Sequence, residues 1–343
     1  MSGYDYYEFR TVDRLLSEAA MVALGGVSSR AEIAADRLVV TYNYGSFRGD
    51  PLALVHEHFD VMVHVSRYHG CRLLFRLPSR VVSPKSLRPY VADGRVLVHE
   101  KPGHVVVELV GFDEDGRDWV DEDEGPDAMK HALALRQQML EGDLAPLYVA
   151  WLGAHANDDD DDATLEPPVP PGLRKPSRAL QALVELLSVP DELLDVAAKA
   201  SPTPPKAAGP TERAFTTWLR AVPERQRNEW LKRAAWEGET GIGAEVLRKF
   251  RKDTSAPAEK PVKGKRSVGE LVTAMRRLDD PLDERKTAAV AKEAAANAQN
   301  AHVEPRLAPF ADGFDVAREG SERAIKARAG EARRYRRRPR ASS

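Results

Sequence analysis

The sequence has almost no cysteine and no long apolar segment. Cys71 is the only cysteine among 343 residues, which excludes an internal disulfide framework and a cysteine-rich zinc site. The longest apolar-rich stretch, residues 52–65, contains three histidines and two carboxylates and is shorter than the about 20 apolar residues that span a bilayer. The N-terminal residues also lack the apolar core of a secretory signal. We therefore expect a cytoplasmic protein with no membrane partner.

Complete catalytic motifs are missing as well. No G-x-S-x-G motif occurs, and the glycines of residues 238–243 follow no predicted strand, as a dinucleotide fingerprint requires. Residues 263–267 lack the upstream glycine of a phosphate-binding loop. The acidic loop that begins at Asp113 places Arg117 at the fifth position, where a calcium loop needs an oxygen ligand. These failures favour a protein that is not an enzyme, and they predict no organic cofactor.

The sequence does have an uneven distribution of charge. Residues 1–173 contain 16 basic and 29 acidic residues, a net charge of −13, whereas residues 174–343 contain 35 basic and 24 acidic residues, a net charge of +11. The acidic residues concentrate in two predicted loops, 113–127 and 158–162. Such a chain is suited to two kinds of partner, or to one half that masks the other.

Basic residues near the C-terminus predict contact with a polyanion. Arginine binds phosphates through two parallel hydrogen bonds, and neutralising several phosphates releases counterions. A tyrosine among the arginines can stack on a base. A nucleic acid, an acidic protein surface and a solvated terminus without a partner are the three interpretations that stay open. The candidate contact residues are Lys263, Lys265, Arg266, Arg276, Arg277, Arg333, Arg334, Tyr335, Arg336, Arg337, Arg338 and Arg340.

A second candidate site is a possible metal-binding face. The sequence predicts a helix from Pro51, with Asp50 as its N-cap, to about Tyr68. His56, Asp60 and His64 are four residues apart and would share one face of that helix. Two histidines and a carboxylate suit Zn²⁺ or non-haem iron, so a divalent metal is the one cofactor that the sequence suggests. The alternative is that these residues are polar flanks of the helix's apolar stripe.

The periodicity of the chain predicts an α+β fold. Its first part has the order strand, helix, strand, helix and then three strands, which indicates a small sheet with helices on one side, and a ferredoxin-like topology is among those that fit. An all-helical region and a basic, partly disordered C-terminus follow. The predicted divisions are an α+β domain (1–156) that ends in one long helix (128–155), an acidic, proline-rich linker (157–176), a helical domain (177–252), a basic linker (253–266), and alanine-rich helices with an arginine-rich tail (267–343).

Five short segments are distinctive: Tyr6-Tyr7-Glu8-Phe9, SRAEI (29–33), TYNYGSFRGDP (41–51), RLLFRLP (72–78) and EPPVP (166–170). Together they resemble an uncharacterised family of bacterial hypothetical proteins over about residues 4–250. The resemblance supplies no catalytic residue, because the family has no established activity. The histidine-rich segment before Cys71 departs from the family pattern, which weakens the metal hypothesis.

These observations favour a non-enzymatic accessory protein. Its N-terminal part would bind an unknown protein partner, and its basic C-terminal region would contact nucleic acid or an acidic partner. One alternative is a metal-dependent enzyme that uses His56, Asp60 and His64. The other is a structural scaffold whose acidic loops, 113–127 and 158–162, mask its own basic tail.

Overall fold

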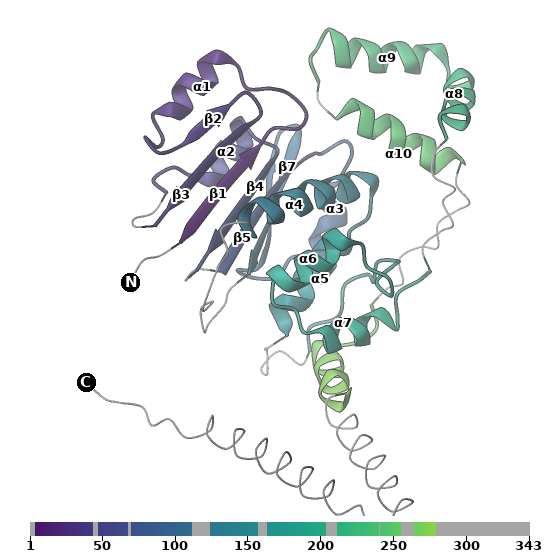
Figure 1. The fold of residues 1–343 in the computed structure, drawn as a ribbon. Coiled ribbons are helices and arrows are strands. Elements are labelled where there is room, and N and C mark those ends of the chain that lie inside the picture. The colour runs from purple at the N-terminus through teal and green to yellow at the C-terminus, as the bar shows by residue number, and fades with distance from the viewer. Residues whose placement is uncertain are drawn as a thin grey trace, which may run out of the picture. The chain divides into compact units, whose positions relative to one another are not determined.

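An antiparallel sheet with helices on both of its faces makes up most of the described chain (Figure 1). The structure is a computed structural model that describes residues 4–43, 47–67, 70–111, 124–156, 163–203, 211–239, 241–254 and 264–278. The chain divides into two units, residues 1–282 and 283–343, and the second lies wholly outside the described residues. The α+β class is confirmed.

The sheet has seven strands in the order β2-β3-β1-β4-β5-β7-β6, and every neighbouring pair is antiparallel. A ferredoxin-like arrangement contains parallel neighbours, so that topology is wrong for this chain. Two of the strands, β6 and β7, form a hairpin, and Gly103 supplies the positive φ of its turn. The strands are β1 (Asp5–Arg10), β2 (Glu32–Ala34), β3 (Arg37–Tyr42), β4 (Val61–Ser66), β5 (Gly70–Pro78), β6 (Val96–Lys101) and β7 (His104–Gly111).

The central strands are apolar on both faces, so both faces carry helices. Val63 and Phe75 belong to the larger core, whereas Met62 and Leu74, one position away on the same strands, belong to a smaller core on the opposite face. The sequence predicts helices on one side of the sheet, whereas the structure has helices on both sides. The larger core contains α4 (Glu124–Glu141), α5 (Ala145–His155), α6 (Arg178–Leu186) and α7 (Asp191–Ala198), and the smaller one contains α1 (Glu18–Gly25) and α2 (Pro51–Glu57).

The second predicted helix begins as expected but ends early. Asp50 caps α2, because its Oδ1 accepts hydrogen bonds from the backbone N–H groups of Leu52 (2.9 Å) and Ala53 (3.2 Å). The helix ends at Glu57, and the next residues form β4. The β-branched residues of β4 favour a strand, and hydrogen bonding to both β1 and β5 overrides the helical spacing of the sequence. The helix predicted to reach Tyr68 is therefore wrong beyond its first two turns.

The long helix predicted over 128–155 is two helices. The first, α4, ends before Gly142, which has a φ of +93°. Leu144 is the N-cap of α5, the Oδ1 of the preceding Asp143 accepts from the Ala145 N–H at 2.9 Å, and Pro146 lies in the first turn of the new helix. Glycine after one helix and proline at the start of the next are standard boundary signals.

The second half of the described chain is helical, as predicted, but α6 and α7 share the larger core with the sheet. A helix over 268–278 joins the same core through Val268 and Leu271. A separate small core lies around Trp230, between α8 (Glu212–Ala221), α9 (Glu224–Ala235) and α10 (Ile242–Thr254). No helix in the described part of the chain has both the length and the apolarity to cross a membrane. A short helix, α3 (Pro84–Leu87), connects β5 to β6.

Candidate functional site

The three residues of the predicted metal site lie on three different segments. His56 is on α2, Asp60 is in the connection that follows, and His64 is on β4. The predicted shared helix face is wrong, because the helix ends at Glu57 before it reaches Asp60. Among the residues that the structure describes, no group of three or more His, Cys, Asp or Glu side chains is placed to hold a metal ion.

Each histidine of that triad has a different partner. His56 Nδ1 lies 2.8 Å from His104 Nε2, at the start of β7. His64 Nε2 lies 3.0 Å from Asp5 Oδ1, and its ring stacks on Tyr7 with centroids 4.0 Å apart. The two histidines thus stabilise different parts of the sheet face and do not converge on one point.

Of the predicted polyanion contacts, only some lie among the described residues. Lys263 and residues 333–340 lie outside them, so their prediction is unchanged. Lys265, Arg276 and Arg277 are described, and all three are exposed. These positions remain compatible with contact to a polyanion.

Arg266 differs, because it forms an internal ion pair. Its Nε donates to Glu166 Oε2 at 2.9 Å, its Nη2 donates to the other oxygen, and its Nη1 donates to the Val196 carbonyl at 2.8 Å. The Tyr148 hydroxyl also donates to Glu166, and burial raises its pKa, so it stays protonated. Backbone pairing between Leu165 and Ser267 places Arg266 beside this buried carboxylate. Arg266 is therefore removed from the set of polyanion contacts.

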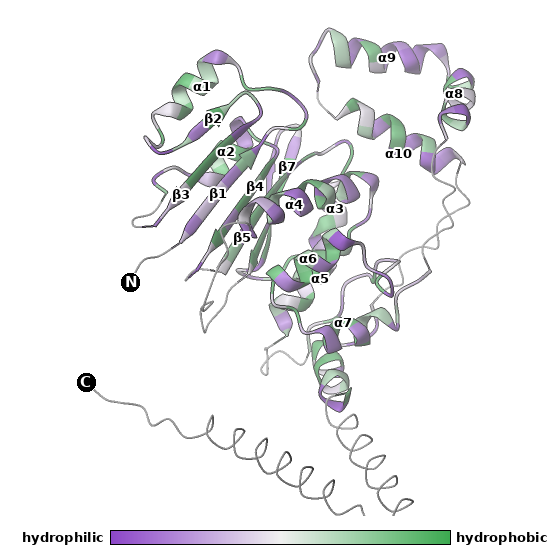
Figure 2. Ribbon diagram, in the orientation of Figure 1, coloured by the Kyte–Doolittle hydropathy of each residue, from purple (hydrophilic) through white to green (hydrophobic). Residues whose placement is uncertain are grey.

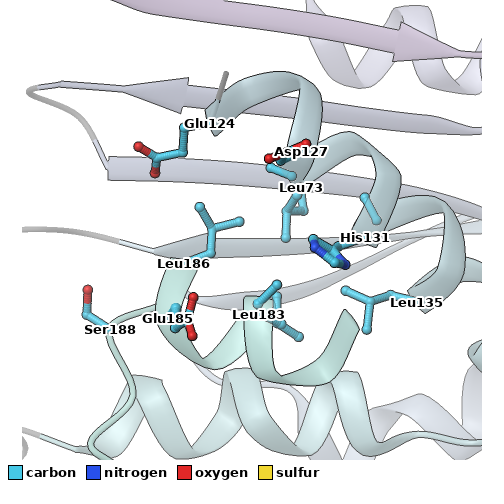
Figure 3. Close-up of a pocket in the computed structure, with 12 residues that line it drawn as sticks. Leu73, Glu124, Asp127, His131, Leu135, Leu183, Glu185, Leu186 and Ser188 are labelled. Carbon is cyan, nitrogen blue, oxygen red and sulfur yellow. The ribbon is translucent and has the colours of Figure 1, made fainter. Parts of the chain in front are cut away.

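A groove between α4 and α6 is the candidate functional site (Figure 3). Its cavity volume is about 510 Å³. Three alanines, two on α4 and one on α6, face it, and their small side chains leave the helices incompletely packed against each other. The lining residues are Leu73 from β5, Glu124, Asp127, Ala128, His131, Ala132 and Leu135 from α4, Ala182, Leu183, Glu185 and Leu186 from α6, and Ser188 after it.

Both walls of the groove carry carboxylates above an apolar floor. Figure 3 shows Glu124 and Asp127 on the α4 side and Glu185 on the α6 side, with leucine side chains between them. Lys130 Nζ donates to Asp127 Oδ1 at 2.6 Å, and this hydrogen bond lowers the pKa of the carboxyl. No lysine or arginine is among the described residues that line the groove.

Sequence reasoning missed this groove. It assigned Glu124 and Asp127 to an acidic loop, whereas both lie in the first turn of α4. The available signal was a helical spacing of acidic residues and alanines at 124, 127, 128 and 132, which share one side of a helix. The α6 wall lies about 50 residues further along the chain, and local patterns do not show which helices meet.

Comparisons of this chain with protein-family models, with curated proteins and with solved structures found no match. The resemblance to an uncharacterised bacterial family therefore stays a prediction, and the geometry of the described residues carries the functional argument.

Proposed function

We propose that this chain is a cytoplasmic protein-interaction module whose α4/α6 groove binds a basic amphipathic helix of a partner protein. The observation that carries the proposal is the combination of a leucine and alanine floor with carboxylates on both walls. An amphipathic helix presents apolar side chains every three or four residues, which would enter the groove. Its flanking lysines or arginines would lie near Glu124 and Glu185.

A designed peptide of leucines and lysines at helical spacing is the probe for this proposal. Binding to the full-length protein, measured by fluorescence anisotropy, is expected to be saturable. A peptide of the same composition, with its leucines spread around the helix, is the matched control and is expected to bind at least 10-fold more weakly. Equal binding of the two peptides would show that charge alone drives the association and would overturn the proposal.

Variants of the groove locate the binding site. Glu185→Gln and Ala128→Leu are each expected to lower the affinity for the peptide at least 10-fold. The first removes a charge from one wall of the groove, and the second fills space at its floor. Asp195→Asn is the matched control, since Asp195 is exposed on α7 and does not line the groove. If all three variants bind alike, the peptide sits elsewhere.

The chain's own C-terminal region is a competing occupant. Residues 318–340 contain ten basic and three acidic residues. Deleting residues 283–343 removes the second unit and keeps every described residue. If the deletion strengthens peptide binding more than 10-fold, the tail rather than a partner occupies the groove at rest.

The same basic region is the second part of the proposal, as a contact for nucleic acid or another polyanion. The arginine-rich sequence at 333–340 and the exposed Lys265 and Arg277 support it. Binding to single- and double-stranded DNA at two salt concentrations tests it, because phosphate contacts weaken as salt rises. Deleting residues 331–343 should reduce both the affinity and its salt dependence, and unchanged binding would refute this part.

A further inference from the structure

A second cavity lies at one end of the sheet, away from the groove residues. Its volume is about 300 Å³, within the lower range of small-molecule sites. Five separate parts of the chain contribute polar side chains to it, together with the turn between β6 and β7. These side chains are Asp13, Asp60, Arg76, Arg80, His104 and Glu239.

The carboxylates of Asp13 and Asp60 are already satisfied within the protein. Asp60 is 2% exposed and accepts hydrogen bonds from the backbone N–H groups of Val12 (2.7 Å) and Asp13 (2.9 Å). Arg136, itself 3% exposed, donates from Nη2 to Asp13 Oδ2 at 2.8 Å and lies 3.6 Å from Asp60 Oδ1. Its Nε donates to the Arg76 carbonyl at 3.0 Å. Arg136 thus pairs with Asp13 and lies close to Asp60, and both carboxylates accept hydrogen bonds from donors within the fold.

The Arg76 guanidinium is not satisfied in this way. Its side chain is 18% exposed, and its Nη1 lies 3.8 Å from Asp60 Oδ1, beyond hydrogen-bond distance. Its Nε is buried and has no hydrogen-bond partner among the described residues. Burial lowers the pKa of this guanidinium, although it stays charged at neutral pH. A largely buried guanidinium whose nearest carboxylate lies beyond hydrogen-bond distance leaves donors unpaired, which is costly, and an anion in the cavity would offset that cost.

Arg80 is the second cation of the cavity and is also weakly paired. Its Nη1 lies 3.5 Å from Glu239 Oε2. Glu239 already accepts two short hydrogen bonds from Arg233, at 2.7 Å and 2.8 Å. The long contact to an occupied carboxylate leaves most of the Arg80 donors available to a ligand.

His104 completes the cavity without adding charge at neutral pH. Burial and the neighbouring Arg76 cation lower the pKa of His104 to about 4. Its Nε2 is held by His56, so the neutral ring has one further nitrogen for a hydrogen bond. The charged groups that line the cavity are two arginines and three carboxylates, and the carboxylates already accept hydrogen bonds from donors within the protein, whereas the arginines have donors available to a ligand.

We propose that this cavity binds a small oxyanion, a phosphate or carboxylate group, through the guanidinium groups of Arg76 and Arg80. Arginine recognises both groups with the same planar pair of donors. Malonate and inorganic phosphate are used as separate probes, because the first tests binding of a carboxylate group and the second tests binding of a phosphate group. The proposal does not depend on the α4/α6 groove, because the two cavities share no lining residue.

The test is isothermal titration calorimetry of the full-length protein with inorganic phosphate and, separately, malonate, at constant ionic strength set by chloride. Saturable binding of either anion at one site per chain is expected. Arg80→Gln should weaken it at least 10-fold, and Arg76→Lys should do the same because lysine keeps the charge but lacks the planar donors. Arg88→Gln is the matched control, since Arg88 is exposed and pairs with Glu100 outside the cavity.

Because Arg80 is exposed, Arg80→Gln tests the proposal even if the variant at the less exposed Arg76 fails to fold. A nuclear magnetic resonance titration gives a second readout, in which the bound anion should raise the pKa of His104. No saturable binding of either anion, or an equal loss in Arg88→Gln and Arg80→Gln, would overturn the proposal.

Discussion

The region built on the sheet and the region formed by α8, α9 and α10 are held together in different ways. The sheet region buries large side chains completely, among them Phe75, and forms two apolar cores. In α8 no residue is buried, and the small core around Trp230 leaves Leu231 65% and Trp236 86% exposed. Figure 2 shows the same contrast, with mostly hydrophobic central strands and a mostly hydrophilic α9.

Ion pairs supply much of the cohesion that the helical region lacks in apolar contacts. Arg233 on α9 donates to Glu239 at 2.7 Å and to Glu245, on α10, at 2.6 Å. Trp230 adds a hydrogen bond from its indole Nε1 to Glu245 at 3.1 Å. Contact between the two regions includes another ion pair, from Arg251 to Glu141, at 2.9 Å. The sheet region therefore depends mainly on burial, whereas the helical region depends on ion pairs as well as on its small core, and the two should fail under different conditions.

The largest expected effect is on the sheet core. Phe75→Ala should lower the free energy of unfolding by about 3–5 kcal/mol, because it leaves a cavity in a close-packed interior. Urea unfolding followed by circular dichroism measures this loss, and hydrogen exchange shows where it acts. Increased exchange in β4 and β7, greater than in α9 and α10, is the expected pattern. The reverse pattern would contradict the division into two regions.

The second largest effect is expected from removing Arg233, the central cation of the helical region. Arg233→Ala should destabilise α8–α10 by about 2 kcal/mol, because it breaks charge-assisted hydrogen bonds and leaves Glu239 and Glu245 without their shared partner. Hydrogen exchange should increase in α9 and α10 while β5 and β7 stay protected. Uniform acceleration in both regions would show that they unfold as one unit.

The pH dependence should differ between the regions. Burial lowers the pKa of His104 from 6.5 to about 4, so the unfolded chain takes up a proton first and the sheet region loses stability as the pH falls from 6.5 towards 4. The Arg233 hydrogen bonds lower the pKa values of Glu239 and Glu245, so their contribution is complete above the ordinary value of 4.5 and is lost only below it. Hydrogen exchange at pH 6.5, 5.0 and 4.0 checks the order of these losses, and earlier opening of α9 and α10 would contradict it.

The smallest expected effect is at the exposed surface of the helical region. Trp236→Ser should change the free energy of unfolding by less than about 0.5 kcal/mol, because the side chain is already in water. Urea unfolding measures the free energy of unfolding of this variant, and the same measurement on Phe75→Ala gives the largest expected loss for comparison. A loss above 1 kcal/mol would mean that Trp236 packs against something in solution.

Local signals predicted where elements begin better than where they end. Asp50-Pro51 correctly predicted the start of α2. The residues that follow could not distinguish a longer helix from a helix followed by β4, because His56, Asp60 and His64 also fit a helical period. Pairing with β1 and β5 decided the outcome, and that pairing is a property of the whole sheet. At the boundary of α4 and α5 the signals were present, as Gly142 and Pro146, but the apolar spacing on either side concealed them.

The candidate sites were less predictable than the fold. The groove needs two helices whose sequences are far apart, and the second cavity needs side chains from Asp13 to Glu239. Charge counting identified the basic C-terminal third, but it could not show that Arg266 meets Glu166, because the position of a carboxylate 100 residues away is set by tertiary packing.

The ion pair between Arg266 and Glu166 also has a mechanical meaning. It joins the start of the helix over 268–278 to a carboxylate that Tyr148, in the middle of α5, also contacts. A pull applied at Leu278, the last described residue of this helix, would therefore be resisted by the Val268 and Leu271 contacts and by the Arg266 ion pair. The helix over 268–278 is thus anchored at its start to the larger core.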